Sequence, residues 1–347
     1  MACISVLFRP FSWVYSFVMN VRNMLFDAGI FRERRFAVPV VTIGNLAVGG
    51  TGKTPHTEYL YNLLKTRGKI GVLSRGYGRD TKGFRWVHPA SSVDECGDEP
   101  CQIKRKYNQA VVAVDENRCE GIQKMLKAEK LAAIVLDDAY QHRYVKPDLN
   151  ILLTDYHRLF SEDRVLPEGH LRESKSGRRR ADIIIVTKCP ADLKPIDFTL
   201  LAKSIQPFAS QRLFFTTQQY SLPYPLFGED RPFEGQKILA VTGISNPHTL
   251  VEYLKRYGDV TPLRFSDHHP FGDEDIAKIN AAFPGHDAII TTEKDATRLV
   301  TQRDKLSAEV RQALFVQPVT VSFLRDEAED FRSLVEQKLF AVRKDFV

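Results

Sequence analysis

The segment that most constrains this chain is a glycine-rich loop between an apolar strand and a helix. The β-branched run Val38–Ile43 ends at Gly44, and a helix is expected over Lys53–Arg67. The loop reads Ala47, Val48, Gly49, Gly50, Thr51, Gly52, Lys53 and Thr54. Its glycines allow a tight turn that presents successive N–H groups to phosphate, and the helix start adds its dipole. The pattern predicts a nucleoside triphosphate site.

Two residues of this loop have expected roles beyond the backbone. Lys53 is expected to reach the β- and γ-phosphates, and Thr54 to bind Mg²⁺. Ala47 stands where the strict motif has glycine, and its methyl group is small enough to be tolerated. The loop therefore predicts ATP or another triphosphate together with Mg²⁺.

A pair of carboxylates supports the same site. The apolar run Ala132–Leu136 ends in Asp137 and Asp138. An acid at the end of a buried strand beside a phosphate loop is the usual second holder of Mg²⁺. The spacing does not decide which of the two serves.

Apolar strands alternate with helical stretches over the first two thirds of the chain. After Val38–Ile43, the expected strands are Lys69–Ser74, Ala110–Val114, Ala132–Leu136, Asn150–Thr154, Asp182–Thr187 and Arg212–Tyr220. Near-continuous apolar strands separated by helices are typical of a parallel sheet covered on both faces. The fold class expected is therefore α/β, with a sheet like that of the P-loop NTPases.

A second, smaller α/β unit is expected after the Pro- and Gly-rich stretch Ser221–Gly235. Its strands are expected at Lys237–Thr242, Thr261–Phe265, Asp287–Thr292 and Leu314–Phe323, and its helices at Pro247–Tyr257 and Asp273–Phe283, with a last helix at Asp326–Phe340. The predicted division is a helical segment 1–36, a domain 37–220 that carries the phosphate loop, a linker 221–235, a smaller domain 236–325 and a C-terminal helix 326–347.

The N-terminus combines aromatic and basic residues. The apolar run 3–19 is interrupted by Arg9 and Pro10, so it is too short to span a membrane. Aromatic side chains mixed with arginines suit a helix that lies in a membrane interface. The alternative is a helix packed on the domain with its aromatics in the core.

Composition and one motif limit which partners and ligands are expected. The formal net charge of +6 favours an anionic partner. Basic residues are scattered rather than grouped with stacking aromatics, so nucleic acid is not expected. Five cysteines without a CxxC pair, one of them Cys3, indicate reduced thiols and no zinc site. Asp192 follows Thr187-Lys188 two places too late for a guanine-reading motif, which disfavours a GTPase.

Several further motifs resemble one family. They are Ile43-Gly44-Asn45-Leu46, the loop with Pro55, Ser74-Arg75-Gly76-Tyr77-Gly78, Gly97-Asp98-Glu99-Pro100, Leu136-Asp137-Asp138-Ala139-Tyr140-Gln141-His142, Leu171-Arg172-Glu173, Asp267-His268-His269 and Thr292-Glu293-Lys294-Asp295-Ala296. Over about residues 1–325 the chain resembles the tetraacyldisaccharide 4'-kinases of lipid A biosynthesis.

The resemblance implies a reaction and a location. The family uses ATP and Mg²⁺ to phosphorylate the 4'-hydroxyl of a tetraacylated glucosamine disaccharide 1-phosphate, forming lipid IVA. It implies a peripheral enzyme on the cytoplasmic face of the bacterial inner membrane, whose partners are the acylated disaccharide lipid and the membrane surface. No obligate protein partner is evident. The alternatives are a P-loop kinase acting on a soluble metabolite and a membrane-recruited ATPase switch.

The resemblance also implies catalytic residues. Asp98 lies in a turn marked by Gly97 and Pro100, where a carboxylate often caps a helix. The matching aspartate of the family is the catalytic base, and the residue matching His268 pairs with it. Asp98 and His268 are 170 positions apart, so such a site requires the two domains to face each other.

A further group of polar residues belongs to the expected cleft. These candidates for substrate binding are Arg75, Glu99, Arg118, Gln141, His142, Arg172 and Glu173. An arginine there can stabilise transition-state charge or hold a phosphate that the acceptor already carries. Lys294 and Asp295 match a family motif, and the sequence supplies no physical role for them.

Overall fold

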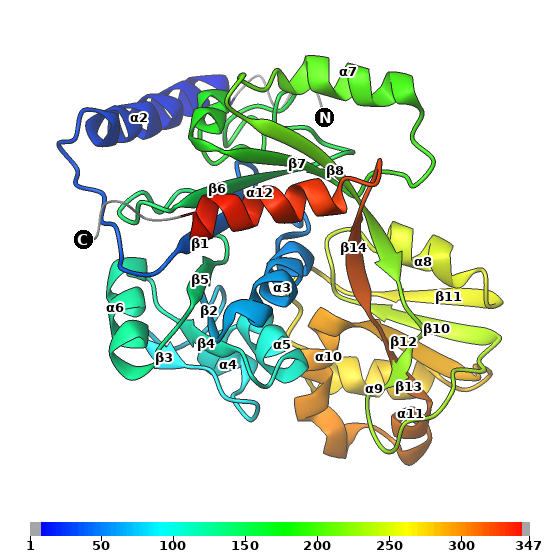
Figure 1. Ribbon diagram of the computed structural model, residues 1–347. Helices are drawn as coiled ribbons and strands as arrows, with labels where there is room; N and C mark the ends of the chain where they lie inside the picture. The colour runs from blue at the N-terminus through cyan, green and yellow to red at the C-terminus, as the bar shows by residue number, and fades with distance from the viewer. Residues whose placement is uncertain (1–7, 342–347) are drawn as a thin grey trace.

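The computed structural model describes residues 8–341. Cys3, the first residues of the apolar N-terminal run and residues 342–347 of the predicted C-terminal segment lie outside this range. The chain forms two sheets that lie side by side, a large one and a smaller one (Figure 1).

The large sheet has nine strands. They are β1 (Val40–Asn45), β2 (Ile70–Ser74), β3 (Arg85–Trp86), β4 (Val111–Val114), β5 (Ala133–Leu136), β6 (Leu149–Asp155), β7 (Ile183–Thr187), β8 (Arg212–Tyr220) and β14 (Val319–Phe323). Their order is β14-β8-β7-β6-β1-β5-β2-β4-β3. The seven inner strands are parallel, and the two edge strands β14 and β3 are antiparallel to their neighbours.

Helices cover both faces of this sheet because alternate strand residues point to opposite cores. In β1, Val41 joins the core beneath α3 (Lys53–Leu64), α5 (Asp98–Lys106) and α12 (Ala328–Phe340). Val40 joins the core on the other face, beneath α6 (Arg118–Ala128), and the core beneath α7 (Pro195–Ile205) is on that face too. The short elements η1 (Lys65–Arg67), α4 (Val93–Cys96) and η2 (Lys175–Arg180) lie in connections.

The smaller sheet has five strands. They are β9 (Tyr224–Pro225), β10 (Lys237–Thr242), β11 (Asp259–Arg264), β12 (Ala288–Thr292) and β13 (Leu314–Gln317), in the order β11-β10-β12-β13-β9. Four of these strands are parallel, and β9 is antiparallel to β13. The helical elements are α8 (His248–Leu254), α9 (Asp273–Ala282), α10 (Glu293–Leu299), η3 (Val300–Lys305) and α11 (Ala308–Ala313). The predicted α/β class, with a large parallel sheet and a second α/β unit, is confirmed.

One predicted element is wrong. The single strand expected over 314–323 is two strands, β13 and β14, which belong to different sheets. Pro318 lies between them and has no N–H for a strand ladder. The predicted linker also contributes β9 to the smaller sheet. We call residues 224–317 the small lobe and the remaining described residues the large lobe.

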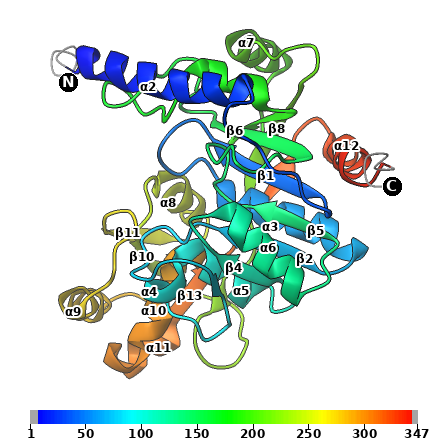
Figure 2. The same cartoon turned by 90° about the vertical axis from the view of Figure 1, so that its left-hand side faces the viewer.

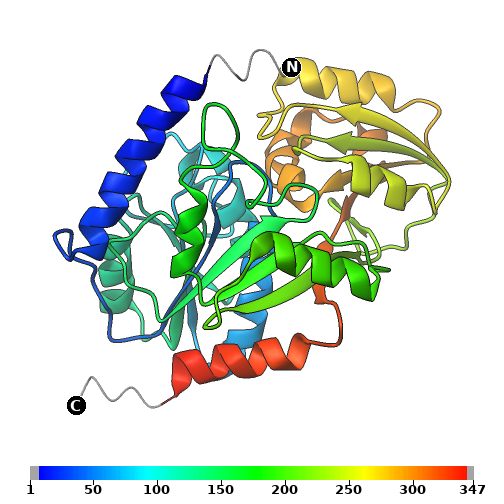
Figure 3. The ribbon, with the colours of Figure 1, turned by 90° about the horizontal axis from the view of Figure 1, so that it is seen from above.

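The N-terminal helix α2 (Arg9–Asp27) lies along the outside of the large lobe, on a different side from α12 (Figures 2 and 3). Its inner face buries Ser12 and Phe26. Phe11, Trp13 and Phe17 are 65%, 73% and 68% exposed, so the alternative in which the aromatics fill the core does not hold for them. Within residues 8–341, no helix is both long and apolar enough to cross a membrane.

Candidate active site

The phosphate loop joins β1 to α3. Gly49 and Gly52 have φ of 104° and 80°, a left-handed conformation that glycine adopts without strain. Gly52 is the N-cap of α3 and supplies no side-chain cap, so the N–H groups of the first turn remain available to an anion. Thr51 is buried, and its Oγ1 has no hydrogen-bond partner among the described residues. The loop is therefore a concave set of donors at a helix start.

Two residues at the end of β7 hold the loop from behind. Thr187 Oγ1 donates to the Thr51 carbonyl at 2.9 Å, and Lys188 Nζ donates to the Gly50 carbonyl and to Asp155 Oδ2. Lys188 comes from the segment that sequence reasoning examined only as a guanine reader. The contacts of Lys188 instead make it a residue that supports the phosphate loop.

Asp137 and Asp138 follow β5 and differ in environment. Thr57 Oγ1 donates to Asp137 Oδ1 at 2.9 Å. Burial, with the charges of Glu99 and Asp138, raises the pKa of Asp137 to about 7. Burial acts in the same direction on Asp138, but Lys53 and Arg172 outweigh it and hold the pKa of Asp138 below its usual range.

Asp138 lies between two cations. Its Oδ2 is 3.6 Å from Lys53 Nζ, and its Oδ1 accepts from Arg172 Nη1 at 2.9 Å. The predicted loop lysine, one predicted carboxylate and the predicted cleft arginine therefore meet at one point. Asp138 has φ of 46°, a strained conformation for a residue with a side chain, as is common at functional sites.

The residues present fit a Mg²⁺ ion shared with a nucleotide. Three carboxylates, those of Asp137, Asp138 and Glu99, lie beside the loop, and the charges of Glu99 and Asp138 add to the effect of burial in raising the pKa of Asp137. A divalent cation relieves the repulsion between such charges. Thr54 lines the same cavity as these side chains. Among residues 8–341 no group of three or more His, Cys, Asp or Glu forms a metal cage.

Asp98 is the first residue of α5, and Gly97 rather than Asp98 is the N-cap. The capping role considered for Asp98 therefore does not hold. Oδ2 of Asp98 lies 2.8 Å from His268 Nδ1 and also accepts from Arg298 Nη2, while Oδ1 accepts from Arg298 Nε at 2.6 Å. Burial raises the pKa of Asp98, but the hydrogen bond from His268 and the charge of Arg298 outweigh it and hold that pKa below its usual value.

His268 comes from the small lobe, in the loop after β11. It has φ of 58°, and its ring lies against Tyr77 of the large lobe, with ring centroids 5.3 Å apart. Lys294 Nζ lies 3.0 Å from His268 Nε2 and 2.9 Å from Asp267 Oδ1. The His268–Asp98 contact joins residues 170 positions apart, as the sequence pairing required.

The remaining predicted cleft residues fall into two groups. Arg75, Glu99, Arg118, Gln141, His142 and Arg172 line one large cavity. Burial and the charges of Arg118, Arg22 and Arg75 lower the pKa of His142 to about 4, so the positive charges converge on this wall. Arg118 donates to backbone carbonyls of Asp115, Glu116 and Asp138.

Glu173 does not line the cavity. It is 1% exposed and accepts from Asn23, Gln141 and Arg180 at 2.9, 3.1 and 2.7 Å. All of these donors belong to the protein, and Asn23 belongs to α2. The contacts give Glu173 the geometry of an anchor for α2 rather than of a group that faces a substrate.

The cavity has a volume of about 890 Å³ and lies between the lobes. Its wall includes the phosphate loop from Val48 to Thr54, Tyr15, Met19 and Arg22 of α2, and residues 244–246 and 292–294 of the small lobe. Asp98 is 1% exposed, because His268 and Arg298 cover it. The site thus combines a phosphate loop with a carboxylate that the small lobe covers.

Sequence reasoning missed several side chains of this site. Arg298 binds Asp98, Thr57 binds Asp137, and Ser245 Oγ donates to Asp267 Oδ2 at 2.8 Å. A signal existed for Arg298, which follows Lys294 by four residues and so lies on the same face of a helix. No signal of this kind existed for Ser245, whose contact joins separate loops.

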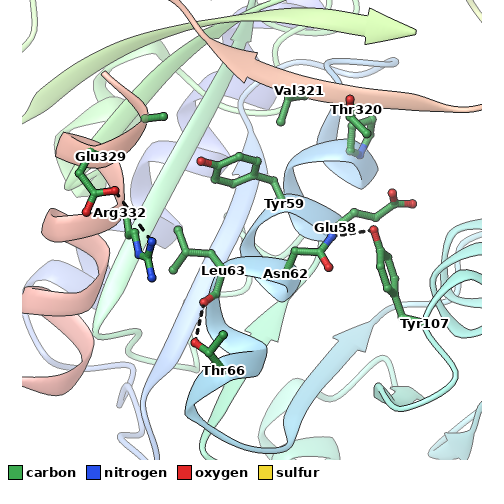
Figure 4. A pocket seen from close by; sticks show the side chains of 12 residues that line it. Glu58, Tyr59, Asn62, Leu63, Thr66, Tyr107, Thr320, Val321, Glu329 and Arg332 are labelled. Carbon is green, nitrogen blue, oxygen red and sulfur yellow. Dashed lines mark hydrogen bonds and ion pairs between the residues drawn. The ribbon is translucent and has the colours of Figure 1, made fainter. Parts of the chain in front are cut away.

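A second, smaller cavity of about 440 Å³ lies on the other side of α3, against α12 and β14 (Figure 4). Tyr59, Leu63 and Val321 supply apolar walls, and Asn62 donates to Tyr107 Oη at 2.8 Å. None of its lining side chains was predicted to be functional. It lies behind the helix whose first turn faces the phosphate-binding cavity.

A parallel sheet, a glycine-rich loop between its central strand and a helix, and an adjacent Asp at a strand end define a P-loop nucleotide-binding protein. The family model described as tetraacyldisaccharide-1-P 4'-kinase, LpxK, matches residues 4–339. The chain belongs to this family.

Relatives and a solved structure agree with the family match. The tetraacyldisaccharide 4'-kinase of Bacteroides thetaiotaomicron is 45% identical over 342 residues, covering 93% of this chain and 90% of that protein. That of Phocaeicola vulgatus is 46% identical over 338 residues, covering 93% and 92%. A crystal structure of LpxK from Aquifex aeolicus in complex with ATP has a TM-score of 0.77 and 29% identity, covering 97% of this chain and 100% of that one.

Proposed function

We propose that this protein is a tetraacyldisaccharide 4'-kinase, which transfers the γ-phosphoryl group of ATP to the 4'-hydroxyl of a tetraacylated glucosamine disaccharide 1-phosphate. The product is lipid IVA, an intermediate of lipid A biosynthesis. The observation that carries the proposal is the joint presence of a phosphate loop and the His268–Asp98 pair at the contact between the lobes, in a chain of this family.

The donor binds at the phosphate loop. N–H groups of the loop and of the first turn of α3 cradle the phosphates, and Lys53 contacts the terminal ones. Arg172 and Arg118 add positive charge where the transferring phosphoryl group accumulates negative charge. Thr54 with Asp137 and Asp138 would hold Mg²⁺, which supplies charge neutralisation to the phosphates when bound.

Asp98 is the base of the transfer. The acceptor's hydroxyl oxygen attacks the γ-phosphorus, its proton passes to Asp98, and the bond between the phosphorus and the β,γ-bridging oxygen breaks to release ADP. Three lone-pair positions of the carboxylate are occupied by His268 and Arg298, which leaves one on Oδ1 for the substrate. Because Asp98 is covered, the contact between the lobes must loosen before the hydroxyl reaches it.

The acceptor is bound between α2 and the arginine-rich wall. Arg75, Arg118 and Arg22 concentrate positive charge around His142, which suits an acceptor that carries a phosphate. Tyr15 and Met19 of α2 line the same cavity, so an acyl chain that follows the helix has an apolar path to it. Gln141 bonds the Asn45 carbonyl at 2.8 Å and fixes this wall next to β1.

The enzyme works peripherally at the cytoplasmic face of the inner membrane, where ATP and the lipid meet. Support for this location comes from the exposed aromatics of α2 and from Arg9 at the start of the helix, whose side chain is 45% exposed while it pairs with Glu168. Aromatic side chains next to arginines bind the interface of an anionic bilayer.

Purified full-length protein with radiolabelled ATP, Mg²⁺ and the tetraacylated disaccharide 1-phosphate in detergent micelles tests the proposal. Wild type is expected to form a labelled bisphosphate lipid. Lys53→Ala and Asp98→Ala are each expected to lower kcat by roughly 10²-fold or more, because each removes a group that acts in the transition state.

Lys255→Ala is the matched control, because it removes an exposed lysine of the small lobe whose ion pair, among residues 8–341, is with Glu252 of α8. No labelled lipid from wild type, with normal product from a known family enzyme in the same assay, would rule out the proposed acceptor. Near-normal turnover by Asp98→Ala would remove the base assignment and leave the kinase assignment intact.

A further inference from the structure

We propose that Lys294 is a positioning residue, whose ammonium group fixes His268 in the tautomer that carries its proton on Nδ1 and donates to Asp98. The proposal deepens the proposed function and rests on Asp98 being the base. Lys294 lies in a motif to which the sequence assigned no role, and the structure supplies one through two contacts.

The donors and acceptors in these contacts determine which ring nitrogen of His268 carries the proton. Lys294 Nζ lies 3.0 Å from His268 Nε2, and an ammonium group can only donate. Nε2 must therefore accept, which leaves the ring proton on Nδ1. Nδ1 lies 2.8 Å from Oδ2 of Asp98, so this N–H is directed at the base.

Lys294 is itself held in place. Its Nζ donates to Asp267 Oδ1 at 2.9 Å, and Ser245 Oγ donates to Asp267 Oδ2 at 2.8 Å. A Cβ added to Gly50 of the phosphate loop would lie only 3.1 Å from Ser245 Oγ. A series of hydrogen bonds thus runs from Ser245 through Asp267, Lys294 and His268 to Asp98, and Ser245 lies close to Gly50 of the phosphate loop.

This arrangement determines where the reaction's proton can go. His268 has no free lone pair, since Nδ1 carries hydrogen and Nε2 accepts from Lys294. The proton taken from the acceptor hydroxyl therefore stays on Asp98 until product leaves. Without Lys294, Nε2 can take a proton, and the resulting imidazolium would bind the carboxylate more tightly and make Asp98 a weaker base.

Other charged and ring groups face the pair from both lobes. Arg298 of α10 binds both oxygens of Asp98, and Tyr77 of the large lobe lies against the His268 ring. His269 points elsewhere, to Asp275 Oδ2 at 2.8 Å. Lys294 is therefore the group that contacts Nε2 among those described around this ring, which makes it the residue to change.

The test combines nitrogen NMR with kinetics on the full-length protein. Imidazole ¹⁵N spectra of histidine-labelled protein are recorded at pH 7.5 for wild type, Lys294→Met and Lys294→Arg, and His268→Gln identifies the signals of His268. The same proteins are assayed for kcat and for the KM of ATP. Lys305→Met is the matched control, because Lys305 makes an exposed ion pair with Asp273 in the same lobe.

Wild type and Lys305→Met are expected to show hydrogen on Nδ1 only. Lys294→Met is expected to show hydrogen on both ring nitrogens and a kcat lower by about tenfold, with the KM of ATP changed less than about threefold. Lys294→Arg, which retains a cationic donor, is expected to restore the wild-type ring pattern and most of kcat.

A wild-type ring with hydrogen on Nε2, or a Lys294→Met ring identical to wild type, overturns the proposal even when kcat falls. Should Lys294→Met fail to fold, Asp267→Asn takes its place, because it removes the carboxylate that holds Lys294 and is expected to move the same signals. The NMR experiment needs no lipid, so it decides the tautomer even if the wild-type protein forms no phosphorylated lipid.

Discussion

Asp98 accepts hydrogen bonds from two residues of the small lobe, and the two have different electrostatic effects. His268 contributes a hydrogen bond at one oxygen, whereas Arg298 brings a full positive charge to both. A cation within hydrogen-bond distance lowers a carboxylate's pKa by about 1–3 units. Arg298 therefore keeps Asp98 ionised, and it also makes the Asp98 carboxylate a weaker base.

Arg298→Met is expected to raise the pKa of Asp98, because burial remains while the main opposing charge is lost. Transfer requires the carboxylate form, so activity falls as pH drops below this pKa. The acid limb of the kcat/KM profile should therefore move to higher pH. The measurement is kcat/KM between pH 4.5 and 8.5. Arg311→Met, which changes an arginine outside the site, should leave the limb in place, and an unmoved limb in Arg298→Met would contradict the pairing.

Some residues of this site were predicted from a local pattern, whereas Asp98 and His268 were predicted from the family resemblance. Lys53 and Asp137 could be placed because each has a fixed position after a strand. Arg298 and Ser245 could not, since their partners lie in separate segments and the contacts exist only once the lobes meet. Glu173 illustrates the opposite error, because a charged residue in a family motif is here an internal anchor.

Strand prediction succeeded where a strand is buried on both faces. Runs such as Ile183–Thr187 and Lys237–Thr242 were found because parallel strands between helices are apolar almost throughout. The two-residue strands β3 and β9 have too few residues for any pattern. The split between β13 and β14 was missed because both halves are apolar, and only Pro318 marks the boundary.

Helix α2 presents an apolar stripe to the outside while polar side chains tie its inner face to the large lobe. Tyr15 Oη donates to the Arg172 carbonyl at 2.9 Å, and Arg22 Nη2 donates to the Gln141 carbonyl at 3.1 Å. The helix therefore connects the membrane interface proposed for it directly to the cavity wall.

Replacing both Trp13 and Phe17 by Glu is expected to weaken binding to vesicles containing anionic phospholipid by about tenfold or more, because two large apolar side chains are lost and two negative charges are added. Vesicle co-sedimentation measures the effect. The melting temperature should change little, since both side chains are exposed.

Leu222→Glu is the control for this experiment, because Leu222 is 77% exposed and lies outside α2. It should bind vesicles as wild type does. Equal binding by the double variant and wild type would show that α2 is not the contact. Activity towards micellar substrate, measured alongside, separates loss of membrane binding from damage to the site.

At the scale of the whole molecule, one buried cluster of charges joins the lobes behind the active site. Lys106 Nζ lies 2.6 Å from Glu58 Oε2 of the large lobe and 2.6 Å from Glu293 Oε1 of the small lobe. Gln102 Nε2 donates to Glu58 Oε1 at 2.8 Å. Burial raises the pKa of Glu58 despite Lys106, because the cluster holds two carboxylates and one ammonium group.

Lys106→Met should leave two buried carboxylates unpaired and lower the free energy of unfolding by about 3 kcal/mol or more at pH 8. The folded-state pKa of Glu58 lies above its unfolded value, so the folded protein takes up a proton more readily as pH falls. The loss of unfolding free energy in Lys106→Met should therefore be smaller at pH 5.5 than at pH 8. Urea unfolding of wild type and variant at both pH values measures this loss. Lys305→Met, which removes one partner of an exposed ion pair, should lower the free energy of unfolding by less than about 1 kcal/mol at either pH. An equal loss of unfolding free energy at both pH values in Lys106→Met would contradict the charge argument.

The chain returns from β13 of the smaller sheet to β14 of the large sheet, and this order affects how the protein folds during translation. Phe323, Phe331, Val335 and Leu339 complete the core beneath α3, where Phe323 and Phe331 lie against Tyr59 with ring centroids 5.2 and 5.9 Å away. All four follow the entire small lobe in the sequence. During translation the nucleotide-binding lobe, which is begun first, cannot close its core until the ribosome has made the small lobe and α12 after it. Folding of the large lobe is therefore completed late, and helix α3 stays partly uncovered while the small lobe is synthesised and folds.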